Sequence, residues 1–371
     1  MGKIKSADKR ILSVDVLRGF DMFWLIGGTG LALAVVKLFG GGVQELLLPQ
    51  LEHTEWIGFT FYDLIFPLFE FVMGMSVVFS LQKILKTDGK AAAYRKLIRR
   101  FILLFLLGIF YYGGLSNAWP DIRILGVLQR LALTYLLTGI LFIHLDLRGM
   151  VIVAAIILIG SWILLSFVPV PDTGKISLTQ QSNWAQYIDE LLLPGKKNGP
   201  GGKWDIAGIF GTFTTTVSCL VGVFAAQIVQ NKLISDKKRL IYLIGGGLAM
   251  VVIGYLWGIQ MPIIKKIWTP TYVLVAGGFS SLLMGVFYYL IDVKGYKMWT
   301  TLFVWIGVNP ITIYMARNLI DFGSISKRFV GGDIAIMLGE QWAYLLSTAV
   351  SLALSLIILR FLYQRKIFLK V

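Results

Sequence analysis

The sequence is poor in residues that form covalent or metal cross-links. It has one cysteine, Cys219, and two histidines, His53 and His144, among 371 residues. A single cysteine excludes an intramolecular disulfide, and no Cys/His cluster with the spacing of metal ligands can be drawn from three such residues. We therefore expect neither a disulfide framework nor a zinc site, and no metal cofactor.

Charged residues are also scarce, at 15% of the chain against 57% hydrophobic residues. Ordinary globular domains carry about 25% charged and about 45–50% apolar residues. Because the few polar side chains cannot cover this apolar surplus, a soluble fold is excluded and a lipid bilayer is the expected solvent. The net charge of +15 would raise nucleic-acid binding in a soluble protein, but here it is better explained by membrane topology. We expect membrane lipids, and no nucleic acid, as partners.

Long apolar runs dominate what is present. A helix needs roughly 20 apolar residues to cross about 30 Å of hydrocarbon, and ten segments of about this length occur. They are 11–36, 60–85, 97–114, 124–143, 150–168, 209–229, 240–259, 272–291, 300–319 and 343–363. The sequence thus predicts an all-α polytopic membrane protein with about ten transmembrane helices, forming a single integral membrane domain over 1–371.

The distribution of basic residues predicts the orientation. If the chain starts inside, the cytoplasmic side holds 22 Lys and Arg residues and the opposite side 11, which is the bias expected for two cytoplasmic termini. The longest polar break, 169–208, then becomes an external loop. Its segment NWAQYIDELLL has helical spacing and is expected to form a short amphipathic helix over an external opening.

Several ionisable residues fall in the apolar segments, where each costs about 2.5–3.5 kcal/mol on insertion and needs a partner or a water-filled cavity. Asp15 and Arg18 are three apart, on one helix face, and form either a structural ion pair or part of a site. Arg123 and Arg130 are seven apart, with Gln129 beside the second. Two cations on one face favour an anionic ligand.

A simpler arrangement is open for the same charges. Asp63 and Glu70, also seven apart, share a helix face and are able to neutralise the two arginines. His53, in the loop sequence HTEW, is either a solvated loop residue or a group at the outer end of a cavity. Asn309 precedes Pro310, which removes a backbone donor, so it marks either a helix kink or an amide available for hydrogen bonding.

Ordered motifs along nearly the whole chain identify a family. They are SVDVLRGFDM, HTEWIGFTFYDLIFPLFEFVMGMSVVFSL, GVLQRLALTY, NWAQYIDELLL, 205–211 and WIGVNPITIY. In this collinear series the chain resembles the heparan-α-glucosaminide N-acetyltransferase family, including its bacterial members. The middle pair of the family's DPEG-like motif is replaced here by Ile206 and Ala207, and Thr29 stands where animal members have Asn.

The resemblance implies a helical bundle of the transmembrane acyltransferase type in the bacterial cytoplasmic (inner) membrane. It also implies transfer of the acetyl group of cytoplasmic acetyl-CoA to the amine of a terminal glucosamine on the external side. His53 corresponds to the active-site histidine of the family. A homodimer is expected by analogy.

This chemistry assigns roles to the remaining candidates. His53 accepts the proton of the amine, Asp63 or Glu52 orients it, and Asn309 or Thr29 donates to the oxyanion. An acetyl-His53 intermediate is the competing mechanism.

The CoA moiety needs its own contacts. Cations at the inner mouth, Arg18 or the 95–100 cluster that ends at Arg100, would hold the phosphates. Gln129, Arg130 and Arg123 would line the route of the pantetheine arm or hold the sugar. Two alternatives to this assignment stay open from the sequence: a polytopic secondary transporter, or an acetyltransferase that acts on hydroxyls of cell-wall or surface polysaccharide.

Overall fold

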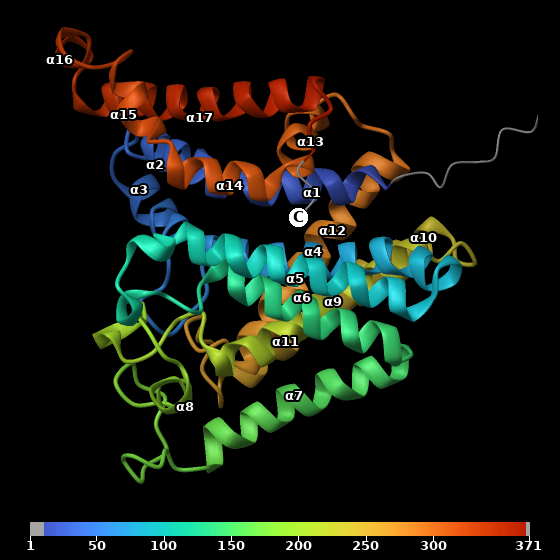
Figure 1. The fold of residues 1–371 in the computed structure, drawn as a ribbon. Helices are drawn as coiled ribbons and strands as arrows, with labels where there is room; N and C mark the ends of the chain where they lie inside the picture. Colours follow the sequence, from blue (N-terminus) through green and yellow to red (C-terminus); the bar gives the residue numbers. More distant parts are fainter. Residues whose placement is uncertain (1–10, 369–371) are drawn as a thin grey trace, which may run out of the picture.

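The computed structural model describes residues 11–368, which form an all-helical bundle (Figure 1). Within this described part no strand occurs, and extended pairing is limited to isolated bridges such as that between Ile57 and Ile264. Eight helical segments in it are long and apolar enough to cross a membrane. They are Leu12–Val36 (α1, η1 and α2), Phe61–Thr87 (α4), Val127–His144 (α6), Leu147–Phe167 (α7), Ile209–Gln230 (α9), Asp236–Gly258 (α10, η6 and α11), Pro270–Val293 (α12 and η7) and Glu340–Gln364 (α17).

Eight is fewer than the ten segments expected from the sequence, and the structure has helices at the two remaining segments as well. The segment at 97–114 belongs to α5 (Gly89–Tyr111), which lies alongside α4 and α6 (Figure 1) but carries a cluster of cations in its first half. The segment at 300–319 is broken into α13 (Thr300–Val308) and α14 (Pro310–Leu319), because Pro310 cannot continue the hydrogen-bond ladder of α13. The charged first half of α5 and the break at Pro310 distinguish these two segments from the eight continuous apolar ones.

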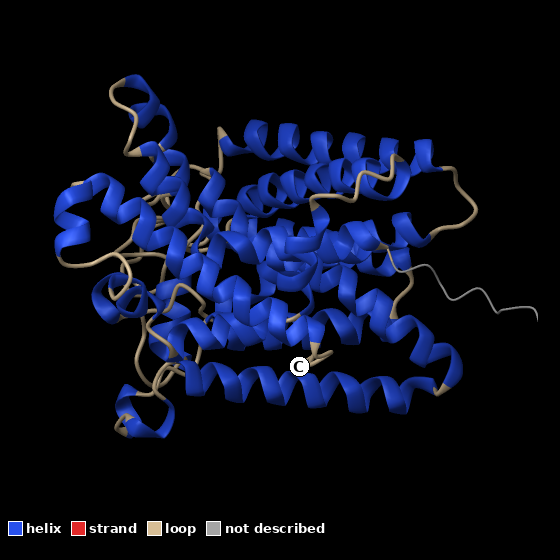
Figure 2. Cartoon of the chain, turned by 90° about the horizontal axis from the view of Figure 1, so that it is seen from above, coloured by secondary structure: helices blue, strands red, loops and turns tan. Residues whose placement is uncertain are grey.

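Short helices gather at one end of the bundle. Figure 1 places α3, α8 and α16 at the left end, and the start of α1 and the end of α17 at the other. The view from above agrees, with loops and short helices at one end of parallel rods (Figure 2). The bounds of these short helices are Gly42–Leu47 (α3), Trp184–Leu192 (α8), Phe322–Lys327 (α15) and Asp333–Leu338 (α16).

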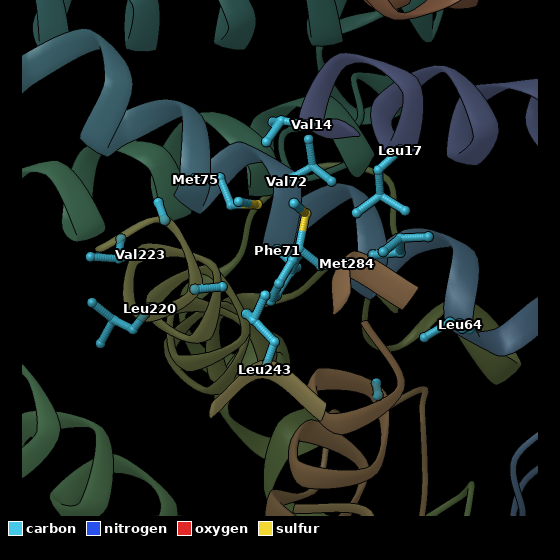
Figure 3. Packing of buried hydrophobic residues seen from close by; sticks show 14 of the residues in the cluster. Val14, Leu17, Leu64, Phe71, Val72, Met75, Leu220, Val223, Leu243 and Met284 are labelled. Atoms are coloured by element: carbon cyan, nitrogen blue, oxygen red, sulfur yellow. The ribbon is translucent and has the colours of Figure 1, made fainter. Parts of the chain in front are cut away.

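The bundle is organised around the close packing of α4 and α9. A Cβ added to Gly74 would collide with the backbone of Cys219, and one added to Gly222 with the backbone of Phe71. Small residues therefore allow the two helices to approach closely, as is usual between membrane helices. Apolar side chains of α1, α4, α9, η6 and α12 fill the adjoining core (Figure 3).

The first membrane segment contains a local irregularity. Between α1 (Leu12–Phe23) and α2 (Thr29–Val36) the backbone forms a π-helical turn, Trp24–Gly28, in which Gly27 has φ 139°. Such turns in α-helices are frequent at functional sites. At the end of this turn, the Thr29 hydroxyl donates a hydrogen bond to the carbonyl oxygen of Trp24, at 3.0 Å.

Candidate active site

His53 lies in the loop between the 3₁₀ turn Pro49–Leu51 (η2) and α4. Its Nδ1 atom is 2.9 Å from Oδ1 of Asp63, and its side chain is 52% exposed. When Nδ1 carries the proton and donates to this carboxylate, Nε2 presents its lone pair as an acceptor. The histidine and carboxylate predicted from the sequence are thus brought into direct contact.

The carboxylate of Asp63 is held by the start of α4 itself. Asp63 is the third residue of the helix, and its Oδ2 accepts from the backbone N–H of Thr60 at 3.2 Å and from the hydroxyl of Thr54 at 3.0 Å. The Thr60 and Asp63 side chains form a capping box, which satisfies orphan N–H groups at a helix start. Asp63 is fully buried, so its orientation toward His53 is set by the fold.

Lys265 is a third member of this group, and the sequence analysis did not single it out. It comes from the loop between α11 (Gly246–Gly258) and α12 (Pro270–Phe287). Its Nζ lies 3.2 Å from Oδ1 of Asp63 and 2.9 Å from Nδ1 of His53. Burial lowers the pKa of the Lys265 ammonium to about 8, although the negative charge of Asp63 opposes that shift.

Tyr62 connects the histidine to the first membrane segment. Its ring stacks on the imidazole of His53, with 4.5 Å between centroids, and its hydroxyl is hydrogen-bonded to Thr29. Thr29 is buried. Tyr62 therefore lies between His53 and Thr29 and contacts both.

Asn309 has a different setting. It is buried at the junction of α13 and α14, and its amide donates to the backbone oxygen of Ile367 at 3.0 Å. Its neighbours Val308 and Pro310 line a large cavity. These contacts place Asn309 beside the cavity and against the carboxyl-terminal segment.

That cavity has a volume of about 2340 Å³, well above the range of about 300–1,000 Å³ usual for small-molecule pockets. Among the described residues its lining has nine cations and two carboxylates. The cations are Arg18, Lys83, Lys86, Lys96, Arg99, Arg100, Lys232, Arg239 and Lys297, and the carboxylates are Asp15 and Asp292. Such an excess favours a polyanionic ligand.

Two of the predicted cofactor-binding cations line the cavity. Arg18 donates to the Ser76 hydroxyl at 2.6 Å and lies 3.6 Å from Asp15. Arg100 stacks on the ring of Tyr135 at 4.3 Å, and its buried Nε atom has no hydrogen-bond partner. An unpaired buried donor of this kind fits a ligand with oxygen acceptors.

The other three candidates do not line the cavity. Arg130 is buried within the bundle, 5.1 Å from the ring of Trp268, and donates to the carbonyl oxygen of Gly208 at 3.3 Å. Gln129 is fully buried, and neither of its side-chain polar atoms has a partner in the structure.

Arg123 forms a bidentate ion pair with Asp205, at 2.7 and 2.8 Å. Asp205 also accepts from the backbone N–H of Asn198 at 3.0 Å, and Asp189 of α8 accepts from the N–H groups of Asp205 and Ile209. Here Arg123 fastens the 169–208 loop to the start of α6. This partner was not the Asp63 or Glu70 considered from the sequence.

The cavity and His53 lie at different levels of the same helix. Residues of α4 from Thr87 back to Phe69 line the cavity, and Asp63 is six positions further toward the start of the helix. At 1.5 Å per residue, the cavity ends about 9 Å along the axis from the Asp63 level. Lys83, at the opposite end, is about 30 Å from it by the same measure.

This arrangement defines a multi-pass membrane protein with a buried carboxylate–histidine pair at one end of the bundle and a cationic cavity at the other. Residues 10–190 match the family model described as heparan-alpha-glucosaminide N-acetyltransferase, catalytic. The match covers nearly half of the chain, and the similarity continues over the rest of it.

Two curated relatives show this continuation. The human heparan-alpha-glucosaminide N-acetyltransferase is 28% identical over 100% of this chain, and the mouse protein of the same name is 27% identical over 99% of it. The chain spans 61% of the length of each relative. The family resemblance drawn from the sequence motifs is confirmed.

Proposed function

We propose that this protein moves the acetyl group of acetyl-CoA to the amine of a terminal glucosamine-type sugar. The names of the relatives and of the family model support the reaction class. The observation that carries the proposal is the geometry of α4, whose one end bears Asp63 beside His53 while the rest lines the cationic cavity. One helix thus connects a site for proton transfer with a site for a polyanion.

The residues of the cavity fit the CoA moiety. Its phosphates match the surplus of cations at the end of the bundle where α1 begins, and a planar base or a phosphate oxygen would occupy the space beside Arg99 and Arg100. The part of the cavity nearest to the level of Asp63 is lined by Phe69, Val72 and Met73, which suit the slender, mostly apolar pantetheine arm. The thioester supplies an activated acetyl carbonyl, which has to reach the level of Asp63.

His53 holds the proton in the transfer step. Asp63 accepts the hydrogen bond of Nδ1–H, so the Nε2 lone pair is directed to the substrate side. As the amine nitrogen bonds to the acetyl carbon, its proton passes to Nε2, and on cleavage of the carbon–sulfur bond that proton goes to the departing thiolate. Thr29 is connected to His53 through Tyr62, and its hydroxyl would donate to the oxyanion after turning away from the carbonyl oxygen of Trp24.

The same proposal places the two substrates on opposite sides of the membrane. The cations that line the cavity come mainly from the segments around 83–100 and 232–239, which the positive-inside rule assigns to the cytoplasm. His53 then faces the external side, with the sugar acceptor. For a bacterial chain the membrane is the cytoplasmic one, and a homodimer is its expected assembly.

A release assay tests the function. Purified protein in detergent is incubated with acetyl-CoA, with and without glucosamine, and free CoA and N-acetylglucosamine are both measured. Direct transfer gives CoA only when the amine is present, and an acetyl-His53 route gives a burst of CoA without it. Absence of product with glucosamine and with glucosamine-terminated oligosaccharides would overturn the proposal.

A further inference from the structure

Lys265 occupies an unusual position relative to the imidazole of His53. Its Nζ is 2.9 Å from Nδ1 and 3.5 Å from Nε2. A donor in the ring plane that points at Nδ1 would be much further from Nε2, because the two nitrogens lie on different edges of the ring. Nearly equal distances place the ammonium over the face of the imidazole, while Oδ1 of Asp63 lies 2.9 Å from Nδ1.

The ammonium is held there by a well-ordered turn. The N–H of Gly58 donates to the carbonyl oxygen of Ile263 at 2.9 Å. Within the turn, the N–H of Thr269 donates to the carbonyl oxygen of Ile264, and the hydroxyl of Thr269 accepts from the N–H of Ile264. Tyr272, in the next helix, donates its hydroxyl to the backbone oxygen of Asp63 at 2.8 Å. The turn is thereby fastened to both the His53 loop and the start of α4.

We propose that Lys265 is a positioning residue that keeps His53 in its unprotonated form and compensates the charge of Asp63. An ammonium over the ring face is attracted to a neutral imidazole and repels an imidazolium, since a like charge disfavours the charged form. Asp63 alone would have the opposite effect, because a carboxylate beside a histidine favours the imidazolium. With both neighbours present, Asp63 orients the ring without drawing a second proton onto it.

The groups that face Lys265 are few. Asp63 from α4 and His53 from the preceding loop contact its Nζ directly, and Tyr62 stacks on the same imidazole. Lys266 is its neighbour in the chain. The pKa of Lys265 is about 8, so most of its side chain carries a charge at neutral pH. The ammonium is therefore present in the pH range in which the proposed transfer needs an unprotonated His53.

The test measures the protonation of His53 without any assumption about activity. Diethylpyrocarbonate modifies only unprotonated imidazole, and mass spectrometry of peptides resolves His53 from the chain's other histidine, His144, which serves as an internal reference. Reactivity is followed against pH for the wild type, Lys265→Met, Lys265→Gln, Lys265→Arg and, as matched control, Lys266→Met. The full chain in detergent is used throughout.

We expect the pH of half-maximal His53 reactivity to rise by about one unit in Lys265→Met and Lys265→Gln, which is a tenfold change in proton binding. Lys265→Arg and Lys266→Met should stay near the wild type, and His144 should not move in any variant. Lys265→Gln keeps an amide donor for Asp63, so it reports the loss of charge even where Lys265→Met is poorly folded. Unchanged curves in the neutral variants, or an equal shift in Lys265→Arg, would overturn the proposal.

A second readout depends on the proposed function. In the acetyl-transfer assay, the acid limb of the kcat/KM profile should move to higher pH in Lys265→Gln, with most of the rate recovered at alkaline pH. If the wild type transfers no acetyl group but the reactivity curves shift as expected, the proposed reaction is wrong and the role of Lys265 stands. If transfer occurs and neither the curves nor the acid limb shifts, only the role of Lys265 is wrong.

Discussion

His53 and Asp63 share one hydrogen bond but have different relations to the fold. His53 is half-exposed and its ring stacks on that of Tyr62. Asp63 is fully buried and caps α4. Substitution of the histidine should therefore lower the rate of transfer without lowering the stability of the fold, whereas substitution of the aspartate should lower both.

His53→Gln is expected to lower the rate of acetyl transfer by about 10²–10⁴-fold, the usual contribution of a positioned general base. The melting temperature should stay close to that of the wild type because the side chain is half-exposed. Product formation is measured by mass spectrometry, with His144→Gln as the matched control, since His144 contacts Tyr94 at the end of α6. Full turnover by His53→Gln would contradict the assignment of the base.

Asp63→Asn and Asp63→Ala should separate orientation from capping. The amide keeps an oxygen for the N–H of Thr60 but no longer fixes the imidazole tautomer, so a large loss of rate with a small loss of stability is expected. The alanine removes the carboxylate of the capping box, a feature worth about 0.3–1.5 kcal/mol, and leaves the ammonium of Lys265 buried without its carboxylate. Thermal unfolding and transfer rates are measured in parallel, and an active Asp63→Asn protein would rule out the orienting role.

Residue types and local spacing predicted part of the site. Asp63 follows His53 by ten positions at the start of an apolar segment, so their contact can be anticipated once the helix is drawn. Lys265 is 212 positions away from His53, and in the sequence it is one of many basic residues at the end of a membrane segment. Its only local signal is its place in a short turn between two apolar runs.

At the scale of elements, the π-helical turn in the first membrane segment positions Thr29. A run of apolar residues with Gly27, Gly28 and Gly30 predicts a helix that packs closely against its neighbours. The structure instead has Gly27 at φ 139°, outside the conformations open to other residues. The reason lies in tertiary packing against α14 and α17, which the segment does not encode alone.

Gly27→Ala should destabilise the protein by about 1–3 kcal/mol, the cost of holding a non-glycine residue in a strained conformation. The added Cβ would also meet the side chain of Leu352 at 3.4 Å. Because the turn positions Thr29, the rate of transfer should fall more than the stability alone explains. Gly40→Ala is the control, since nothing lies within 4 Å of its added Cβ, and equal melting temperatures for the two variants would contradict the expectation.

Two of the apolar segments predicted from the sequence do not form continuous apolar helices: α5 has a charged first half, and the α13–α14 pair is broken in the middle. In α5 an apolar second half follows a first half with Arg95, Lys96, Arg99 and Arg100, because that half faces the cationic cavity. The α13–α14 pair is mostly apolar and is divided at Asn309. The sequence left a helix kink and an amide available for hydrogen bonding as alternatives. The structure has both, and the acceptor of the amide, the carbonyl oxygen of Ile367, lies in the folded carboxyl-terminal segment.

At the scale of the whole molecule, charge is separated along the bundle axis. Nine cations line one cavity, most of them from segments that the sequence assigns to the cytoplasmic side, while the other end has a small group in which Lys265 and Asp63 compensate each other. Under the proposed function, this distribution would direct the polyanionic substrate to the end with the cavity.

Arg99→Glu tests this separation, because Arg99 is exposed and lines the cavity. The change of two charges should raise KM for acetyl-CoA by about tenfold, equivalent to 1.4 kcal/mol, and should alter kcat far less. The effect should weaken as salt is added. Arg148→Glu, exposed at the start of α7 and absent from the cavity lining, is the matched control, and equal KM values for the two variants would argue against the cavity as the CoA site.

The sequence by itself predicted the solvent, the helical class, the family resemblance and His53 with Asp63 or Glu52 as its partner, because apolar run length, local spacing and ordered motifs are properties of neighbouring residues. Only the tertiary structure decided the partners of the charges. Arg123 meets Asp205, 82 positions away, and Lys265 joins the site from 212 positions away. Such pairs form where a low-dielectric interior makes an unpaired charge costly, and which charges meet there depends on how the helices pack.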